Sequence, residues 1–239
     1  MIAVGADGCK GGWLALRVRD GRLANARLFV DADALWSAWG DAELLLLDVP
    51  IGLPDEGPER RCDLEARRVL GRPRAASVFP APSRPALLAA DYEAACRINE
   101  LRSGRRLSRQ TWAIMPKIRE VDALLAAEPR ARGRCRESHP EVCFWALAGR
   151  PMRGAKRTPQ GQWERIKVLG RVMPAAPLVV RRVMNAFPRR FLACDDVLDA
   201  LALAVTAALA SGGSRTVPDE PERDARGLPM EMVHVVRRP

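Results

Sequence analysis

Ile2-Ala-Val-Gly-Ala-Asp7-Gly-Cys-Lys-Gly-Gly-Trp13 is the stretch that decides the fold of this 239-residue chain. Its first residues are small or apolar and rich in β-formers, which predicts a strand buried on both faces. The strand is expected to stop at Asp7, and glycines then turn the chain into a second apolar run that begins at Trp13. A buried charge is costly unless a cation or a protonated neighbour compensates it. The sequence therefore predicts that Asp7 marks the functional site.

The following segments predict a mixed sheet. Glycine-containing turns indicate an antiparallel meander of three strands up to Val30, and a short helix is expected over 32–39. Four consecutive leucines, Leu44–Leu47, then predict a buried parallel strand that ends at Asp48. Because ligands of open α/β sheets bind at the carboxyl ends of the strands, Asp7 and Asp48 are expected to converge on one site.

Residues 55–134 interrupt this rhythm and are expected to form a helical insertion over the site, within a single domain of residues 1–239. Six residues are expected to face inward from the helix over 86–101: Leu87, Leu88, Tyr92, Ala95, Ile98 and Leu101. The helices predicted in the insertion cover 60–70, 86–101 and 110–127.

The last third of the chain is expected to return to the sheet and to end in helices. The clearest of these is 195–209, which has one wide apolar face. A charged loop is expected over 218–227, followed by a closing edge strand over 230–236. The other elements predicted here are a strand over 134–138 and helices over 139–147, 158–172 and 177–187.

Six carboxylates are candidates for a site: Asp7, Asp48, Glu137, Asp195, Asp196 and Asp199. Simpler roles exist for three of them. Asp195 could cap a helix, and Asp196 could lie in the first turn of that helix, where the helix dipole stabilises an acid. Glu137 could be an exposed acid beside arginines. Asp199 is harder to explain, because it lies a full turn inside an apolar helix. As a set, these acids predict an oxygen-ligand cage for Mg²⁺ or Mn²⁺ and a two-metal displacement at phosphorus.

Basic residues supply the candidate substrate contacts: Lys10, Lys117, Arg119 and His139. Lys10 could equally be a solvated turn residue, and His139 could be a general base, a metal ligand or a helix cap. The net charge is +10 and the arginines are clustered, which favours a nucleic acid partner. A genome that favours arginine codons would also explain the charge, since only four of the 39 basic residues are lysine.

Several protein classes are excluded or disfavoured by composition. The apolar runs are too short to span a bilayer, so no membrane partner is expected. The six cysteines show no Cys-x-x-Cys spacing, which indicates reduced thiols and a cytoplasmic protein. The oligomeric state is left open, a homodimer included.

The order of these elements resembles the ribonuclease-H-like fold: α/β, with a five-stranded sheet of three antiparallel strands plus parallel strands, and flanking helices. More narrowly, the chain resembles a bacterial and archaeal family of unknown function whose members are described as predicted ribonuclease-H-like nucleases. The segments that carry this resemblance are Gly5–Trp13, Asp48–Pro54, Arg61–Arg67, Ser77–Pro80, Pro116–Asp122, Glu137–Phe144 and Asp195–Leu201. The resemblance implies that Asp7, Asp48 and the late helix acids bind metal. Many such nucleases carry Glu where this chain has Asp48.

Three functions compete at this stage. The leading expectation is a metal-dependent nuclease of DNA or RNA, a hydrolase of phosphodiester bonds. The turn after Asp7 also resembles the phosphate hairpin of the sugar-kinase and actin superfamily, but those proteins need two such domains. The third reading is a non-catalytic nucleic-acid or metabolite-binding protein that keeps the fold.

Overall fold

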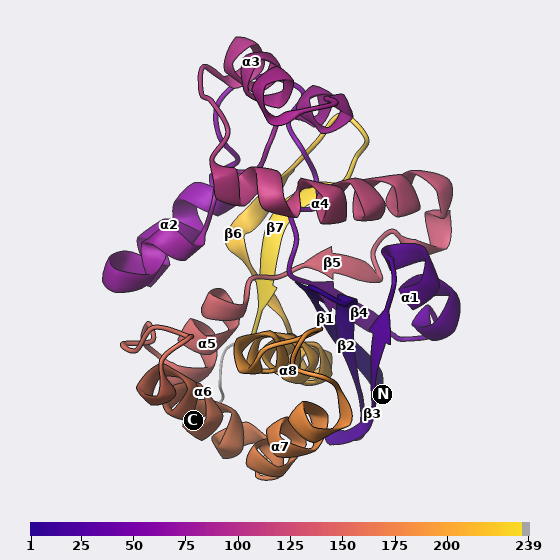
Figure 1. Cartoon of the computed structure of the whole chain (residues 1–239), viewed down its shortest axis with the longest axis vertical. Helices are drawn as coiled ribbons and strands as arrows, with labels where there is room; N and C mark the ends of the chain where they lie inside the picture. Colours follow the sequence, from indigo (N-terminus) through magenta and orange to yellow (C-terminus); the bar gives the residue numbers. More distant parts are fainter. Residues whose placement is uncertain (236–239) are drawn as a thin grey trace.

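The computed structural model describes residues 1–235, and at its centre lies a five-stranded mixed sheet in the order β3-β2-β1-β4-β5 (Figure 1). The first three strands are antiparallel neighbours, whereas β4 runs parallel to β1 and β5 runs parallel to β4. This confirms the predicted α/β class and is consistent with a ribonuclease-H-like arrangement. The strands are β1 (Ile2–Cys9), β2 (Gly12–Arg19), β3 (Arg22–Phe29), β4 (Leu44–Leu47) and β5 (Cys135–Glu137).

β1 is longer than predicted. It does not stop at Asp7 but continues to Cys9, because Asp7 pairs with Leu14 of the antiparallel neighbour β2. The parallel pairing with β4 ends earlier, at Ala6 opposite Leu47. Asp7 therefore lies on a rigid, paired strand at the point where its other neighbour has ended.

Helices cover both faces of the sheet (Figure 1). One face is packed mainly by α8 (Cys194–Leu209), with α5 (Pro140–Ala148), α6 (Pro159–Val172) and α7 (Ala176–Ala186) around it. The opposite face is packed by α1 (Ala32–Trp39) and α4 (Arg109–Ala127). None of the helices within residues 1–235 is both long enough and apolar enough to cross a membrane.

The predicted insertion contains the helices α2 (Arg61–Arg74), α3 (Tyr92–Ser103) and α4. The short 3-10 helices η1 (Ala75–Ser77) and η2 (Arg84–Leu88) lie between α2 and α3, and η3 (Pro129–Ala131) follows α4. Its last helix is part of the core, because buried α4 residues such as Ile118 and Val121 pack with apolar side chains of the sheet. The insertion is therefore joined to the sheet through α4, while α3 lies farther out (Figure 1).

One helix prediction in this block was wrong. The segment 86–101 is not a single helix, because Asp91 accepts a hydrogen bond from the Ala94 amide and begins a new helix, α3, after the turn η2. Leu88 and Leu101, expected to face inward, are 86% and 85% exposed. The other four residues expected inward do lie against the core: Leu87, Tyr92, Ala95 and Ile98. The break at 89–91 therefore changed the helix boundaries and misplaced only Leu88 and Leu101.

The C-terminal segment forms a separate hairpin of β6 (Arg215–Arg223) and β7 (Pro229–His234). The charged loop expected over 218–227 is therefore wrong for 218–223, since the charged side chains lie on the exposed positions of β6. The expected closing strand is β7, but it pairs with β6 rather than with the edge of the main sheet. Val236, the last residue of that prediction, lies outside the described residues.

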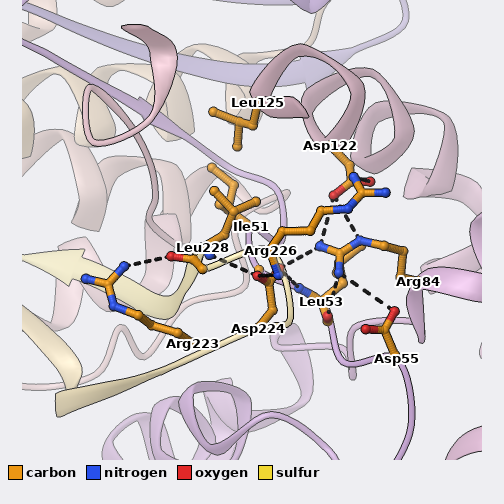
Figure 2. A network of polar contacts seen from close by, with 12 residues as sticks. Ile51, Leu53, Asp55, Arg84, Asp122, Leu125, Arg223, Asp224, Arg226 and Leu228 are labelled. Atoms are coloured by element: carbon orange, nitrogen blue, oxygen red, sulfur yellow. Dashed lines mark hydrogen bonds and ion pairs between the residues drawn. The ribbon is translucent and has the colours of Figure 1, made fainter. Parts of the chain in front are cut away.

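A polar network fastens this hairpin to the insertion and to the segment after β4 (Figure 2). The Asp224 carboxylate accepts hydrogen bonds from the Leu53 amide at 3.0 Å and the Leu228 amide at 2.9 Å. Arg84 donates to Asp224 at 2.5 Å and to Asp122 of α4 at 3.1 Å. These bonds connect the hairpin, the insertion and the segment after β4, which are far apart in sequence. They fix the segment that follows Asp48 at Leu53.

Candidate active site

Strand register brings Asp7 and Asp48 to the same place. Ala6 pairs with Leu47 in the parallel ladder, and the Asp48 amide donates to the Ala6 carbonyl at 3.1 Å. Side chains alternate between faces along a strand, so Asp7 projects on the same face as Gly5, the face that α8 covers. The two aspartates are therefore neighbours beneath the start of α8, as their strand-end positions predict.

Asp199 is the third acid of this group, and it comes from α8. It is 1% exposed, one turn inside the helix, over the sheet face that carries the two strand aspartates. The pKa of Asp7 responds to the charges of both Asp48 and Asp199, and the pKa of Asp199 responds to Asp48. These three carboxylates form one electrostatic group, which we call the carboxylate floor.

The other two acids of α8 have different partners. Asp196 accepts a hydrogen bond from the Ala193 amide at 2.7 Å, so it caps the N-terminus of its own helix. Asp195 faces Arg157, whose Nε lies 3.4 Å from its carboxylate. Both residues line the same cavity as Asp199, but Asp196 is engaged in starting the helix and Asp195 is engaged with Arg157.

A cavity of about 1210 Å³ opens above the carboxylate floor. It is large enough for a drug-sized ligand or a short segment of a polymer. The acids that line it are Asp7, Asp48, Asp63, Glu137, Glu141, Asp195, Asp196 and Asp199. The basic residues that line it are Lys10, Arg60, Lys117, His139, Lys156, Arg157 and Arg189.

Burial and mutual repulsion shape the titration of the floor. Burial raises the pKa of Asp7 well above its usual range, and the charges of Asp48 and Asp199 raise it further. Burial raises the pKa of Asp199 to about 6, although the Lys156 ammonium opposes this rise. Lys156 Nζ lies 2.6 Å from Asp199 Oδ2, and the acids around this ammonium raise its pKa. The floor is thus short of positive charge, and Lys156 supplies part of it.

Two buried carboxylate oxygens in this region lack a hydrogen-bond partner: Oδ1 of Asp199 and Oε2 of Glu141. Both residues line the cavity, and the charge of Glu141 also raises the pKa of Asp199. Unpartnered buried carboxylate oxygens and a surplus of negative charge fit a hard cation such as Mg²⁺ or Mn²⁺. No three Asp, Glu, His or Cys side chains within residues 1–235 form a ready-made ligand group, however, so the carboxylates would have to converge further to hold an ion.

Glu137 is held in a buried network rather than free to bind an ion. Arg60 donates to both Glu137 oxygens, at 2.7 and 2.9 Å, and the Ile51 amide donates to Oε2 at 2.6 Å. The same guanidinium donates to both oxygens of Asp63. Burial raises the pKa of Glu137 while the Arg60 charge opposes the rise. These bonds fix the segment after Asp48, which gives Glu137 a positioning role, while its catalytic role stays a prediction.

Glu137→Gln is expected to lower the free energy of unfolding by about 3 kcal/mol, because it removes one of the two carboxylates, Glu137 and Asp63, that balance the buried Arg60 guanidinium. Mn²⁺ affinity, measured by calorimetry at a temperature where the variant is folded, should change by less than about threefold if Glu137 is no ligand. A loss of Mn²⁺ binding in this folded variant would return Glu137 to the ligand set.

The predicted substrate contacts divide into three at the cavity and one away from it. Lys10 is exposed at the rim, and Lys117 of α4 lies over Trp13 and 3.1 Å from Glu120. His139 lines the cavity but also caps α5, since its Nδ1 accepts from the Glu141 amide. Arg119 does not line it, because its Nε donates to the Leu87 carbonyl and ties α4 to η2.

Sequence reasoning missed Lys156, Glu141 and Arg60. Lys156 had one usable signal, since it is one of only four lysines in a chain that otherwise uses arginine. Glu141 lies within a quoted motif, two residues after His139, yet nothing in the spacing shows that its carboxylate is buried. Arg60 lies 77 residues from its partner Glu137, a pairing that only the folded chain reveals.

Comparison with known proteins identifies a family whose description names no activity. A family model described as "Protein of unknown function (DUF429)" matches residues 5–223. No curated protein and no solved structure matches the chain. The match begins at Gly5 and extends into β6, so it includes the carboxylate floor and every lining residue except Met232.

Proposed function

The chain belongs to the DUF429 family, and since that description names no activity, we propose from the site itself that the protein is a metal-dependent nuclease that hydrolyses phosphodiester bonds of DNA or RNA. The observation that carries the proposal is the carboxylate floor: Asp7, Asp48 and Asp199 at the base of one cavity, with a buried Asp199 oxygen that has no partner. Asp7, Asp48 and Asp199 would hold the cation. A bound Mg²⁺ or Mn²⁺ would lower the pKa of water and stabilise charge on a phosphate.

The chain's own residues prepare this chemistry by placement. β1, β4 and α8 fix the three carboxylates on rigid elements, which keeps the negative charge in one place before any ligand arrives. Arg60, through Glu137 and the Ile51 amide, fixes the segment that leaves Asp48. The result is a preorganised acidic floor whose neutralisation is the driving force for cation binding.

Charge around the cavity supports a polyanionic substrate. Lys10, Arg157 and Arg189 line the cavity outside the floor, and the whole chain has a net charge of +10. A phosphate backbone would be drawn to such a basic rim, while its scissile phosphate is repelled by the acids unless a cation neutralises them. A cytoplasmic location is part of this proposal, since six free thiols are typical of a reducing compartment.

Calorimetric titration of Mn²⁺ and Mg²⁺, followed by a cleavage screen on labelled single- and double-stranded DNA and RNA, tests the proposal. We expect Mn²⁺ binding at millimolar concentration or tighter, and cleavage that EDTA abolishes. Affinity for the cleaved polymer should fall steeply as salt rises from 50 to 200 mM, by at least about tenfold. Absence of metal binding at pH 8 would contradict the nuclease proposal. If the protein then still bound nucleic acid in a salt-sensitive way, the non-catalytic function would be favoured.

A further inference from the structure

Lys156 lies in the loop between α5 and α6, and its ammonium is directed at the carboxylate floor. Its Nζ is 2.6 Å from Asp199 Oδ2, and its charge also acts on Asp7. The two side chains differ greatly in exposure, 41% for Lys156 and 1% for Asp199. Lys156 therefore reaches a buried acid from the cavity side, which distinguishes this pair from ion pairs between two exposed groups, whose contribution is small.

The loop that carries Lys156 is anchored by buried groups of α6. Arg165 is 0% exposed and donates to the carbonyls of Gly154 at 3.0 Å and Gly161 at 2.9 Å. Glu164 accepts from the amides of Arg153 and Gly154, each at 2.9 Å. The loop segment just before Lys156 is thus held against α6, which sets the position of the lysine.

Close packing adds to this anchoring. A Cβ on Gly161 would lie 2.0 Å from the carbonyl oxygen of Ala155, the residue before Lys156. A Cβ on Gly154 would lie 2.5 Å from the Gly161 Cα. The loop can approach α6 this closely only because both residues are glycine. This close packing helps to hold Lys156 over the floor.

Charge balance indicates what the lysine does. Asp7, Asp48 and Asp199 carry three negative charges when ionised, and Lys156 supplies one positive charge, which leaves a net charge of minus two on these four groups. The other acids beside the floor have partners of their own: Glu141 pairs with Arg165, Asp195 pairs with Arg157, and Asp196 caps α8. One divalent cation balances that remainder, whereas two would leave an excess of positive charge in a buried site. The free Asp199 oxygen, Oδ1, remains available for that single cation while Oδ2 is held by the lysine.

We propose that Lys156 is the resident second cation of this site, so that the carboxylate floor takes one divalent ion and not two. The inference rests on the proposed metal-dependent function and makes it more specific: the site uses one metal ion and one lysine. In this arrangement Lys156 is a positioning residue, which neutralises Asp199 and keeps a second divalent ion away.

Counting bound Mn²⁺ tests the inference without any measurement of activity. The free Mn²⁺ remaining at each addition is read from its electron paramagnetic resonance signal. We expect one ion per chain for the wild type and for Lys156→Arg, and a second ion for Lys156→Met. Lys167→Met is the matched control, since it removes a lysine of the neighbouring helix α6 that lies over Trp163 and not over the floor; it should still bind one.

A second pair of variants tests the same idea through the loop. Gly161→Ala should displace the lysine and admit a second Mn²⁺, whereas Gly170→Ala, on the same helix with nothing near its added Cβ, should not. Two ions in the wild type, or a single ion in Lys156→Met, would overturn the role of Lys156. No Mn²⁺ in any variant would instead overturn the metal site of the proposed function, so the two failures are distinguishable.

Discussion

Asp7→Asn is expected to abolish metal-dependent cleavage, lowering its rate by at least about a thousandfold, which corresponds to about 4 kcal/mol of transition-state stabilisation. Asp7 is the acid with the most direct claim on the cation, because it lies on the paired part of β1 beside Asp48 and below Asp199. The asparagine keeps the shape of the side chain but removes one of the three charges that make the site attractive to a cation. Cleavage and Mn²⁺ affinity should therefore be lost together.

The same substitution is expected to stabilise the metal-free protein by about 1 kcal/mol, the usual size of a stabilising single substitution. The sign follows from the raised pKa of Asp7, whose causes are burial and the neighbouring acids. A group with a raised pKa contributes stability that is present below its unfolded pKa and is lost as the pH rises through its folded pKa. Asparagine never ionises, so the free energy of unfolding of the variant should rise above that of the wild type as the pH increases. Near pH 3.5 the two free energies should be almost equal.

Thermal unfolding in EDTA at several pH values, beside Mn²⁺ titration of the same samples, measures both effects. Asp33→Asn is the control, since it removes the same charge from an exposed position of α1. A destabilised Asp7→Asn protein that also fails to cleave would indicate a structural role for Asp7. Greater stability together with lost metal binding would mark it as a residue kept for function at a cost in stability.

The carboxylate floor was the part of the site that the sequence could predict. Strand alternation and the carboxyl-end position of Asp48 follow from local pattern, and Asp199 is unusual within an apolar helix segment. The choice between Asp195 and Asp196 as a further ligand could not be made from spacing alone. Only the folded chain shows that Asp196 accepts from the Ala193 amide while Asp195 faces Arg157, and neither contact leaves a sequence signal.

The remainder of the site depends on how distant segments pack. Lys156 reaches the floor because α6 holds its loop through Arg165 and Glu164. In the sequence these two residues look like ordinary charged residues of a helix, so nothing marks them as anchors of the loop. Glu137 was predicted to be catalytic because it follows a strand, as Asp48 does. Its buried partner Arg60 comes from the insertion, where the sequence indicated only a charged helix. Tertiary pairing of charges leaves no periodic signal, so these roles were beyond sequence reasoning.

Hydrophobic spacing predicted a helix correctly where one continuous helix presents one apolar face. It failed where a helix is interrupted and a second one begins. α8 was predicted almost to its ends, because its apolar face is continuous over four turns. The helix expected over 86–101 was wrong, because a capping aspartate, Asp91, starts a new helix in the middle of that range. A capping residue thus outweighed an apolar pattern, which is expected when the pattern itself is short.

Gly5→Ala is expected to destabilise the protein strongly, because the added methyl group has no room between β1 and α8. The new Cβ would lie 2.0 Å from the Ala204 amide nitrogen and 2.5 Å from the Ala200 carbonyl oxygen. Both atoms belong to the backbone of α8, so relief requires the whole helix to move away from β1. Overpacking of this kind costs on the order of 3 kcal/mol, a substantial part of the stability of a typical domain.

Gly8→Ala is the matched control for that substitution, because it lies on the same strand and its Cβ meets only the flexible Lys117 side chain, at 3.5 Å. Any gain in strand propensity from glycine to alanine applies to both variants, so their difference isolates the contact with α8. Urea unfolding followed by circular dichroism should place Gly5→Ala about 3 kcal/mol below Gly8→Ala. Because α8 also carries Asp199, any Gly5→Ala protein that folds should bind Mn²⁺ more weakly, since its third carboxylate is displaced from the floor. Equal stability of the two variants would show that β1 and α8 are not in close contact, and the placement of Asp199 over Asp7 would then be wrong as well.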